Sequence, residues 1–212
     1  MRYSEIVGDY EVYKRLQVRD FCSFESQSST WRIGQERYIQ EVLSGYDRSL
    51  RVLDIACGDG VGLTVFAAYG FANVVGVELN PAKADRARQS GYPVFTCDMH
   101  ALDMFEDGAF DVVYSSHTLE HAYYPDRAIL EMRRVVSAEG AFHVVLPYPD
   151  RGDANVLAHG AKFELGTDVE DGADTVVRTF EARGCALREI RFASFREPEV
   201  WLEFGKVPLS AR

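Results

Sequence analysis

The sequence has no cluster of basic residues and no long apolar segment. Lys and Arg total 23 against 33 Asp and Glu, a formal net charge of −10, so we expect no broad surface for nucleic acid or for an anionic membrane. The longest nearly uncharged stretch, 61–77, contains polar residues and glycines and is shorter than the ~20 apolar residues of a membrane span. Charges occur throughout residues 1–15, where a signal peptide has an apolar core. These absences predict a cytoplasmic protein.

Cysteine is scarce and widely spaced. Cys22, Cys57, Cys97 and Cys185 form no CxxC pair, and no histidine lies at the spacing of a zinc finger. We therefore expect free, mostly buried thiols rather than disulfides or a zinc site. The acids of residues 103–107 are typical of a solvated turn, whereas a catalytic divalent cation needs a cage of oxygen ligands, so no metal is expected.

The pattern of apolar runs predicts an α/β fold. With 212 residues, 47% of them hydrophobic, the chain is long enough for one domain with a full core. From residue 51 onward short apolar runs alternate with helix-like segments, and their composition is typical of parallel strands covered by helices on both faces. The predicted strands of this alternating region are 51–56, 73–78, 94–97, 110–115 and 141–146.

Helix signals and a final hairpin complete the pattern. Asn80 and Pro81 mark a helix start, and Gly91 marks its end. Residues 126–140 predict a helix with one apolar face, and residues 173–183 predict another. Two strands, 187–195 and 200–207, then form a hairpin. The glycine-rich connection 148–172 is expected to overlie the functional site.

The first 46 residues lie outside the strand and helix alternation. They contain eight aromatic residues and predict one or two helices. Either a cap over the site or a packing layer that contacts no ligand explains these aromatics, because they dominate core burial wherever they occur. We expect one domain with three parts: this helical cap (1–46), a cofactor-binding half (47–150) and a substrate-side loop with the closing hairpin (151–212).

The segment VLDIACGDGVG, from Val52 to Gly62, is the most informative about function. Glycines after a strand let the backbone approach a ligand closely. Their spacing here is GxGxG, which differs from the GxGxxG of dinucleotide-binding turns. Asp54, four residues before the first glycine, would repel a pyrophosphate and attract a ligand that carries an ammonium group. A nicotinamide dehydrogenase is therefore disfavoured.

Two further acids end the next two predicted strands. Glu78 lies 20 residues after Gly58, the place where a carboxylate accepts hydrogen bonds from both hydroxyls of a ribose. Asp98 is placed to accept a hydrogen bond from the exocyclic amine of adenine. Because ligands bind beyond the carboxyl ends of the strands in open α/β sheets, the three acids together predict an adenosine-bearing ligand.

Four segments resemble, in order and spacing, the motifs of class I S-adenosylmethionine-dependent methyltransferases. They are VLDIACGDGVG, VVGVELNP, FTCDMHALDMFEDGAFDVVYSSHTLEH and GAFHVVLPYP. The likeness extends from about Arg51 to Pro149 and is greatest to small bacterial-type enzymes whose fourth strand continues into H-x-L-E-H, here His117 to His121. It implies a Rossmann-like, mostly parallel sheet of seven strands in the order 3-2-1-4-5-7-6, the seventh antiparallel. Ala56 departs from the glycine that is usual at its position.

The resemblance implies S-adenosylmethionine as the cofactor and assigns its contacts. Asp54 and the backbone of residues 56–60 would hold the methionine moiety, Glu78 the ribose, and Asp98 with Met99 the adenine. The expected contacts are Asp54, Ala56, Cys57, Gly58, Gly60, Glu78, Leu79, Asp98, Met99, Ser115 and Ser116. Arg37 is added because an Arg fork matches a carboxylate, with a solvated helix arginine as the alternative.

The expected reaction is methyl transfer to an oxygen or nitrogen of a small molecule or glycan-like metabolite. Positioning of the acceptor supplies much of the rate, and an imidazole suits a general base near neutral pH. His121 and His117 are the catalytic candidates, with His121 favoured and His159 a weaker third; a purely structural histidine is the alternative for each. The second hypothesis for the chain is a catalytically silent adenosylmethionine-binding module in an assembly. The sequence leaves the oligomeric state open.

Overall fold

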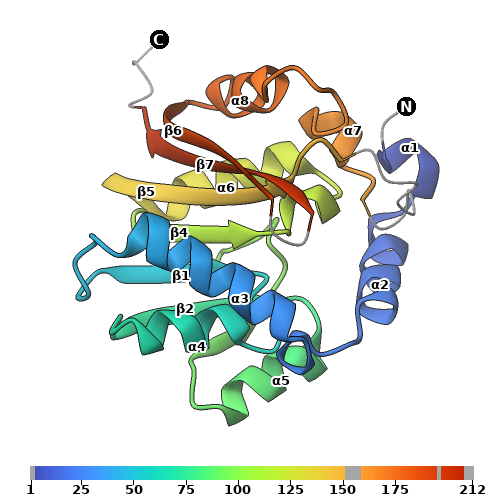
Figure 1. Ribbon diagram of the computed structural model, residues 1–212. Helices are drawn as coiled ribbons and strands as arrows, with labels where there is room; N and C mark the ends of the chain where they lie inside the picture. Colours follow the sequence, from blue (N-terminus) through green and yellow to red (C-terminus); the bar gives the residue numbers. More distant parts are fainter. Residues whose placement is uncertain (1–2, 151–158, 195–196, 208–212) are drawn as a thin grey trace.

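A seven-stranded sheet forms the centre of the protein. The computed structural model describes residues 3–150, 159–194 and 197–207. The strand order is β3-β2-β1-β4-β5-β7-β6 (Figure 1). Pairing is parallel from β3 to β5, and β7 is antiparallel to both β5 and β6, so the expected Rossmann-like order is confirmed. The strands are β1 Arg51–Ile55, β2 Asn73–Glu78, β3 Val94–Thr96, β4 Phe110–Ser116, β5 Val136–Pro147, β6 Cys185–Ser194 and β7 Pro198–Lys206.

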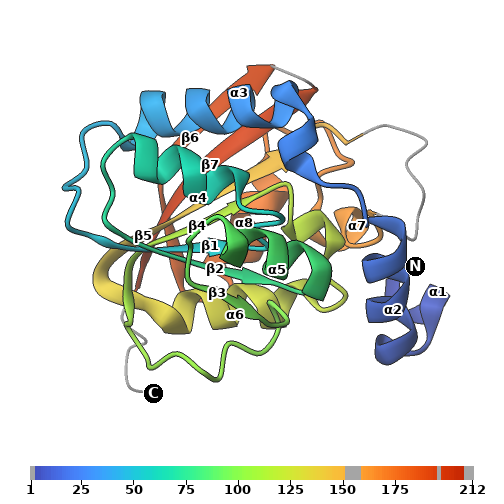
Figure 2. The same cartoon turned by 90° about the horizontal axis from the view of Figure 1, so that it is seen from below.

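Helices cover both faces of the sheet (Figure 2). On one face lie α3 (Ser29–Tyr38), α4 (Val61–Ala68) and α5 (Pro81–Gln89), and on the other lie α6 (Pro125–Val135) and α8 (Asp174–Glu181). Each layer closes over its own cluster of buried apolar side chains. The shorter elements are α1 Tyr3–Val7, α2 Tyr10–Asp20, η1 Glu25–Gln27, η2 Ile39–Leu43, η3 Leu119–His121 and α7 Lys162–Leu165.

The parallel register brings the ends of the central strands to one edge. In β1, Asp54 pairs with Gly76 of β2 and with Tyr114 of β4, and Glu78 of β2 pairs with Thr96 of β3. Because β1, β2, β3 and β4 are parallel, their carboxyl ends all lie at one edge of the sheet. The loops that follow β1, β2, β3 and β4 therefore gather at the same edge, the usual place for a ligand in an open α/β sheet.

The predicted helix over 126–140 is too long at its end. Helix α6 stops at Val135, and β5 begins at Val136, which pairs with Phe110 of β4. A side chain at Gly140 would meet the carbonyl oxygen of Asp111 at 2.7 Å. This glycine therefore lets β5 run close to β4, and strand pairing takes over residues whose apolar spacing alone also fits a helix.

The N-terminal residues fulfil both roles that the sequence left open. Helices α1 and α2 lie beside the carboxyl edge of the sheet (Figures 1 and 2). Helix α3 and the turn η2 instead join the core layer, where Tyr38, Ile39 and Leu43 are buried. The region is thus part cap and part packing layer, with more helical elements than the one or two expected.

The other regions add two observations. No helix in residues 3–150, 159–194 or 197–207 is long and apolar enough to cross a bilayer. Of the predicted connection 148–172, residues 151–158 lie outside the described ones, and the described remainder includes the short helix α7.

Candidate cofactor and acceptor site

A cavity of ≈ 240 Å³ lies at the carboxyl edge of the sheet. Its walls come from the loops after β1 to β4 on one side and from the N-terminal region on the other, with His159 and Glu197 from the C-terminal part of the chain. Most of the cofactor contacts expected from the sequence line it. These are Asp54, Ala56, Cys57, Gly58, Glu78, Leu79, Asp98, Met99 and Ser116.

The turn after β1 is built from left-handed backbone. Ala56, Gly58 and Gly60 have φ of 55°, 57° and 94°, a region that is costly for side chains larger than hydrogen. The N–H of Gly58 points at the β2 end, where it donates to Glu78 Oε2 at 3.0 Å. This conformation holds the glycine backbone open to the cavity and starts α4 at Gly60.

Asp54 brings a buried carboxyl group to the cavity. It is 4% exposed, and burial together with the nearby charge of Glu78 raises its pKa to about 8. A side chain at Gly62 would lie 2.4 Å from Asp54 Oδ2, so the glycine leaves the carboxyl group the room that it occupies. A cationic ligand at this place would offset the repulsion between the two acids.

Glu78 is held by the backbone and still has acceptor capacity. Its oxygens accept hydrogen bonds from the N–H groups of Gly58 and Asn80 at 3.0 and 2.7 Å. Burial raises the pKa of Glu78, partly opposed by Asn80, Lys83 and Gly58. Since a carboxylate offers about four lone-pair positions, two remain for the hydroxyls of a ribose.

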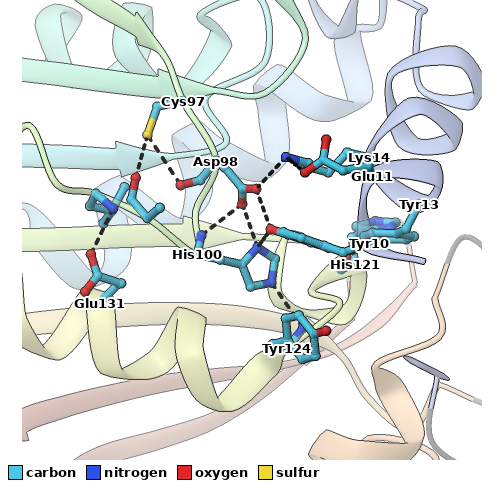
Figure 3. Close-up of polar contacts among 12 residues, drawn as sticks. Tyr10, Glu11, Tyr13, Lys14, Cys97, Asp98, His100, His121, Tyr124 and Glu131 are labelled. Carbon is cyan, nitrogen blue, oxygen red and sulfur yellow. Dashed lines mark hydrogen bonds and ion pairs between the residues drawn. The ribbon is translucent and has the colours of Figure 1, made fainter. Parts of the chain in front are cut away.

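Asp98 lies in a network that ties α2 to the end of β3 (Figure 3). The Tyr10 hydroxyl donates to Asp98 Oδ2, and His100 Nδ1 lies 2.6 Å from Asp98 Oδ1. Because the Tyr124 N–H donates to His100 Nε2 at 3.2 Å, the Nδ1 of His100 carries the proton and donates to Asp98. Burial opposes ionisation, but the hydrogen bonds from His100 and Tyr10 lower the pKa of Asp98 to about 2. Asp98 is therefore a carboxylate at neutral pH.

The N-terminal region also covers the glycine turn. Glu25 forms an ion pair with Lys83, and a side chain at Gly58 would lie 2.7 Å from Glu25 Oε2. Ser26 donates its N–H to both oxygens of Asp59 at 3.1 Å. Asp59 does not line the cavity and is only 4% exposed, because this segment packs over it.

The candidate bases His117 and His121 line the same cavity. His117 Nδ1 is 3.6 Å from Glu120 Oε1 and 3.6 Å from Glu197 Oε1, and its Nε2 is 3.4 Å from Glu199 Oε1. Burial lowers the pKa of His117, but these carboxylates outweigh it, so the net shift is upward. His121 Nε2 lies 3.9 Å from Glu120 Oε1.

His159 joins these imidazoles. Its ring centroid is 4.8 Å from that of His121. A hydrogen bond to Asp150 raises the pKa of His159 against the effect of burial. Within the ranges that the structure describes, no group of three or more His, Cys, Asp or Glu side chains is arranged to hold a metal ion.

Comparison with known proteins agrees with this geometry. Residues 53–144 match the family described as a methyltransferase domain. The chain is 26% identical over 199 residues to sterol 24-C-methyltransferase erg-4 of Neurospora crassa, covering 90% of this chain and 52% of that protein. It is 28% identical over 205 residues to malonyl-[acyl-carrier protein] O-methyltransferase of Geobacter sulfurreducens, covering 92% and 69%. The crystal structure of the [4+2]-cyclase SpnF matches with a TM-score of 0.67 at 17% identity over 83% and 81%.

Residues 53–144 thus resemble a methyltransferase domain, and the fold is that of solved S-adenosylmethionine-dependent methyltransferases such as the one from Mesorhizobium loti, with a TM-score of 0.59 at 17% identity over 74% of this chain and 90% of that one. The family and the fold imply S-adenosylmethionine as the cofactor. The residues around the cavity fit such a group, since the carboxyl groups of Asp54, Glu78 and Asp98 could accept hydrogen bonds from its ammonium, hydroxyl and amine donors. The chain spans about half the length of the first curated relatives that it matches.

Three of the expected cofactor contacts do not line the cavity of the methyltransferase domain: Gly60, Ser115 and Arg37. Gly60 belongs to the turn after β1 and lies against Ala87 of α5. Ser115 is fully buried in β4. Arg37 lies on α3, where it pairs with Glu41 at 2.8 Å in the i, i+4 arrangement of a solvated helix face. This placement agrees with the alternative given for Arg37.

Several residues that line the cavity carry no signal in the sequence. Tyr10, Glu25 and Trp31 come from the N-terminal region, and no local motif marks them because only the tertiary fold brings them to the site. The sequence does indicate that Glu120 could lie near His117. It comes three residues later, the spacing of neighbours on one helical turn.

Proposed function

We propose that the chain transfers a methyl group from S-adenosylmethionine to an oxygen or nitrogen of a small molecule or glycan-like metabolite. The observation that carries the proposal is that one cavity is lined both by Asp54, Glu78 and Asp98, from β1, β2 and the loop after β3, and by the imidazoles of His117, His121 and His159. We further propose that the chain works as one domain in which residues 1–46 cap the site, 47–150 bind the cofactor and 151–212 complete the substrate side.

Each end of the cavity has a distinct role in this proposal. Asp54 and the turn from Ala56 to Gly60 hold the methionine moiety, Glu78 with Leu79 holds the ribose, and Asp98 with Met99 holds the adenine. Ser116 lies beside the methionine end. Bound S-adenosylmethionine supplies a methyl group on a positively charged sulfur, which is already activated for transfer.

The remaining task of the protein is to align the acceptor and take its proton. We assign the proton to His121, because a base acts through its neutral form. The carboxylates around His117 raise the pKa of that imidazole, which favours its protonated form. His117 instead fits a role in holding Glu120 and the acceptor in place.

A thermal-shift comparison tests the proposal. S-adenosylmethionine and S-adenosylhomocysteine should raise the melting temperature, since a ligand that binds only the folded state stabilises it, whereas NAD and NADP should not. Stabilisation by NAD or NADP alone would contradict the assignment. Accumulation of S-adenosylhomocysteine with an acceptor then separates an enzyme from the silent binding module.

A further inference from the structure

One oxygen of a buried carboxyl group beside the candidate bases has no hydrogen-bond partner among the described residues. Glu120, in η3, is 1% exposed and lines the cavity. Its Oε2 is fully buried and has no hydrogen-bond partner among the described residues. A buried polar group without a partner costs stability unless something else satisfies it. The position of this oxygen therefore points to a ligand that donates a hydrogen bond.

The described neighbours of Glu120 do not supply a donor to Oε2. Oε1, the other oxygen, lies 3.6 Å from His117 Nδ1 and 3.9 Å from His121 Nε2, beyond the length of a good hydrogen bond. Burial, partly opposed by the charge of His117, raises the pKa of Glu120 to about 7. An arriving positive charge would favour the ionised carboxylate.

Two aromatic rings lie close to the rings of His117 and His121. The Phe21 ring centroid is 4.7 Å from that of His121, and the Trp31 centroid is 5.4 Å from that of His117. Both aromatic residues line the cavity. Aromatic faces together with a carboxylate are the surroundings that attract a cationic nitrogen, and a hydrogen bond between two charged groups is about twice as strong as a neutral one.

We propose that the acceptor subsite, formed by Glu120, His117, His121, Phe21 and Trp31, binds a protonated amine whose N–H donates to Oε2 of Glu120. The proposal rests on the function given above and narrows its acceptor to a cationic nitrogen. An alcohol of the same shape donates one neutral hydrogen bond and gains nothing from the rings, so the subsite discriminates against it.

Competition between amines and alcohols of the same shape tests this inference. Butylamine, phenethylamine and tyramine are each titrated calorimetrically into the complex with S-adenosylhomocysteine, beside 1-butanol, 2-phenylethanol and tyrosol. We expect at least one amine to bind about 10-fold or more tightly than its alcohol. Glu120→Gln should remove that preference, while Glu139→Gln, a change at an exposed residue, should keep it.

The outcomes separate the two proposals. If S-adenosylhomocysteine binds and no amine exceeds its alcohol, the cationic acceptor is wrong and the methyltransferase proposal stands. An amine preference that survives in Glu120→Gln also overturns the role of Glu120. If S-adenosylhomocysteine does not bind to the unmodified chain, the methyltransferase proposal itself fails. Binding of S-adenosylhomocysteine to Glu120→Gln shows that the variant is folded.

Discussion

The carboxylates at the strand ends have different environments, and each environment suits a different part of a ligand. Asp54 is destabilised as an anion, whereas Asp98 is stabilised as one. Glu78 is fixed by two backbone N–H groups. The sequence predicted that the three acids lie at or near the ends of strands, but the groups that set their charges include remote residues such as Tyr10.

The contact between Glu78 and the ribose predicts a loss of affinity on truncation. Glu78→Ala should weaken S-adenosylhomocysteine by roughly 10- to 100-fold, since hydrogen bonds to a charged acceptor contribute ~1.5–3 kcal/mol. Titration calorimetry measures the loss, and Glu139→Ala serves as an exposed control. Unchanged affinity in a folded Glu78→Ala protein would remove this residue from the site.

The raised pKa of Asp54 predicts a dependence of stability on pH. Folding raises this pKa from 3.8 to about 8, so the folded state binds the proton more tightly and loses stability as pH rises between these values. The Asp54→Asn variant has no ionisable group at this position, so its stability should not fall in this way as the pH rises. Without ligand, its melting temperature should exceed that of the unmodified chain at pH 8 by about 3 °C or more, the effect of ~1 kcal/mol in a domain of this size.

Two controls complete the Asp54 measurement. The difference in melting temperature should shrink as the pH falls from 8 toward 3.8, the pKa of Asp54 in the unfolded state, because below that value both states bind the proton. Asp54→Asn should also bind S-adenosylhomocysteine more weakly, because the ammonium group loses its partner. A difference that stays constant with pH would show that the carboxyl group is not destabilised by burial.

The imidazoles predict a split between binding and turnover. Once an acceptor is known, His121→Ala should keep the affinity for S-adenosylhomocysteine and lower turnover by ~10²–10⁴-fold, the range of general-base contributions. Because the base must be neutral, its pKa appears on the acidic limb of the rate profile. That limb should disappear in His121→Ala and persist in His117→Ala. Full activity in both variants and in the double variant would leave alignment alone as the mechanism.

At the scale of elements, strands were easier to predict than the segments that close the site. Strands β1, β2 and β4 are apolar runs with polar ends, and the sequence located them within one residue. The predicted end of the helix over 126–140 was wrong because Val135 and Val136 fit both the apolar face of a helix and a buried strand. The pairing of Val136 with Phe110 of β4 makes this segment a strand. The residues around Val136 in the sequence do not reveal which distant strand it pairs with.

The hydrogen bonds between η1 and Asp59 lead to a prediction about the N-terminal cap. Their removal should make this segment more mobile and leave the affinity for the cofactor nearly unchanged. Asp59→Ala removes the acceptor of Ser26, so amide hydrogen exchange at residues 25–28 should accelerate. Affinity for S-adenosylhomocysteine should change by less than about threefold, or ~0.7 kcal/mol, because Asp59 does not line the cavity. A loss of affinity as large as that measured for Asp54→Asn would show that the cap is part of the cofactor site.

For the whole molecule, the resemblance to a known family carried the prediction of sheet order, while the closure of the site was beyond it. The contact between Tyr10 and Asp98 joins residues 88 positions apart, and the ion pair of Glu25 with Lys83 joins residues 58 apart. Neither pair has a local pattern that marks it. The N-terminal region thus determines the shape of the cavity, although the motifs that identify the cofactor lie elsewhere.

A crystal structure of the chain with S-adenosylhomocysteine tests the placement of the cofactor most directly. We expect the ribose hydroxyls within about 3 Å of the Glu78 carboxylate oxygens, the ammonium group at Asp54 and the adenine amine at Asp98. Asp98 Oδ2 has a second lone pair for that amine beside Tyr10. A ligand bound elsewhere, or one whose ribose lies away from Glu78, would contradict this assignment.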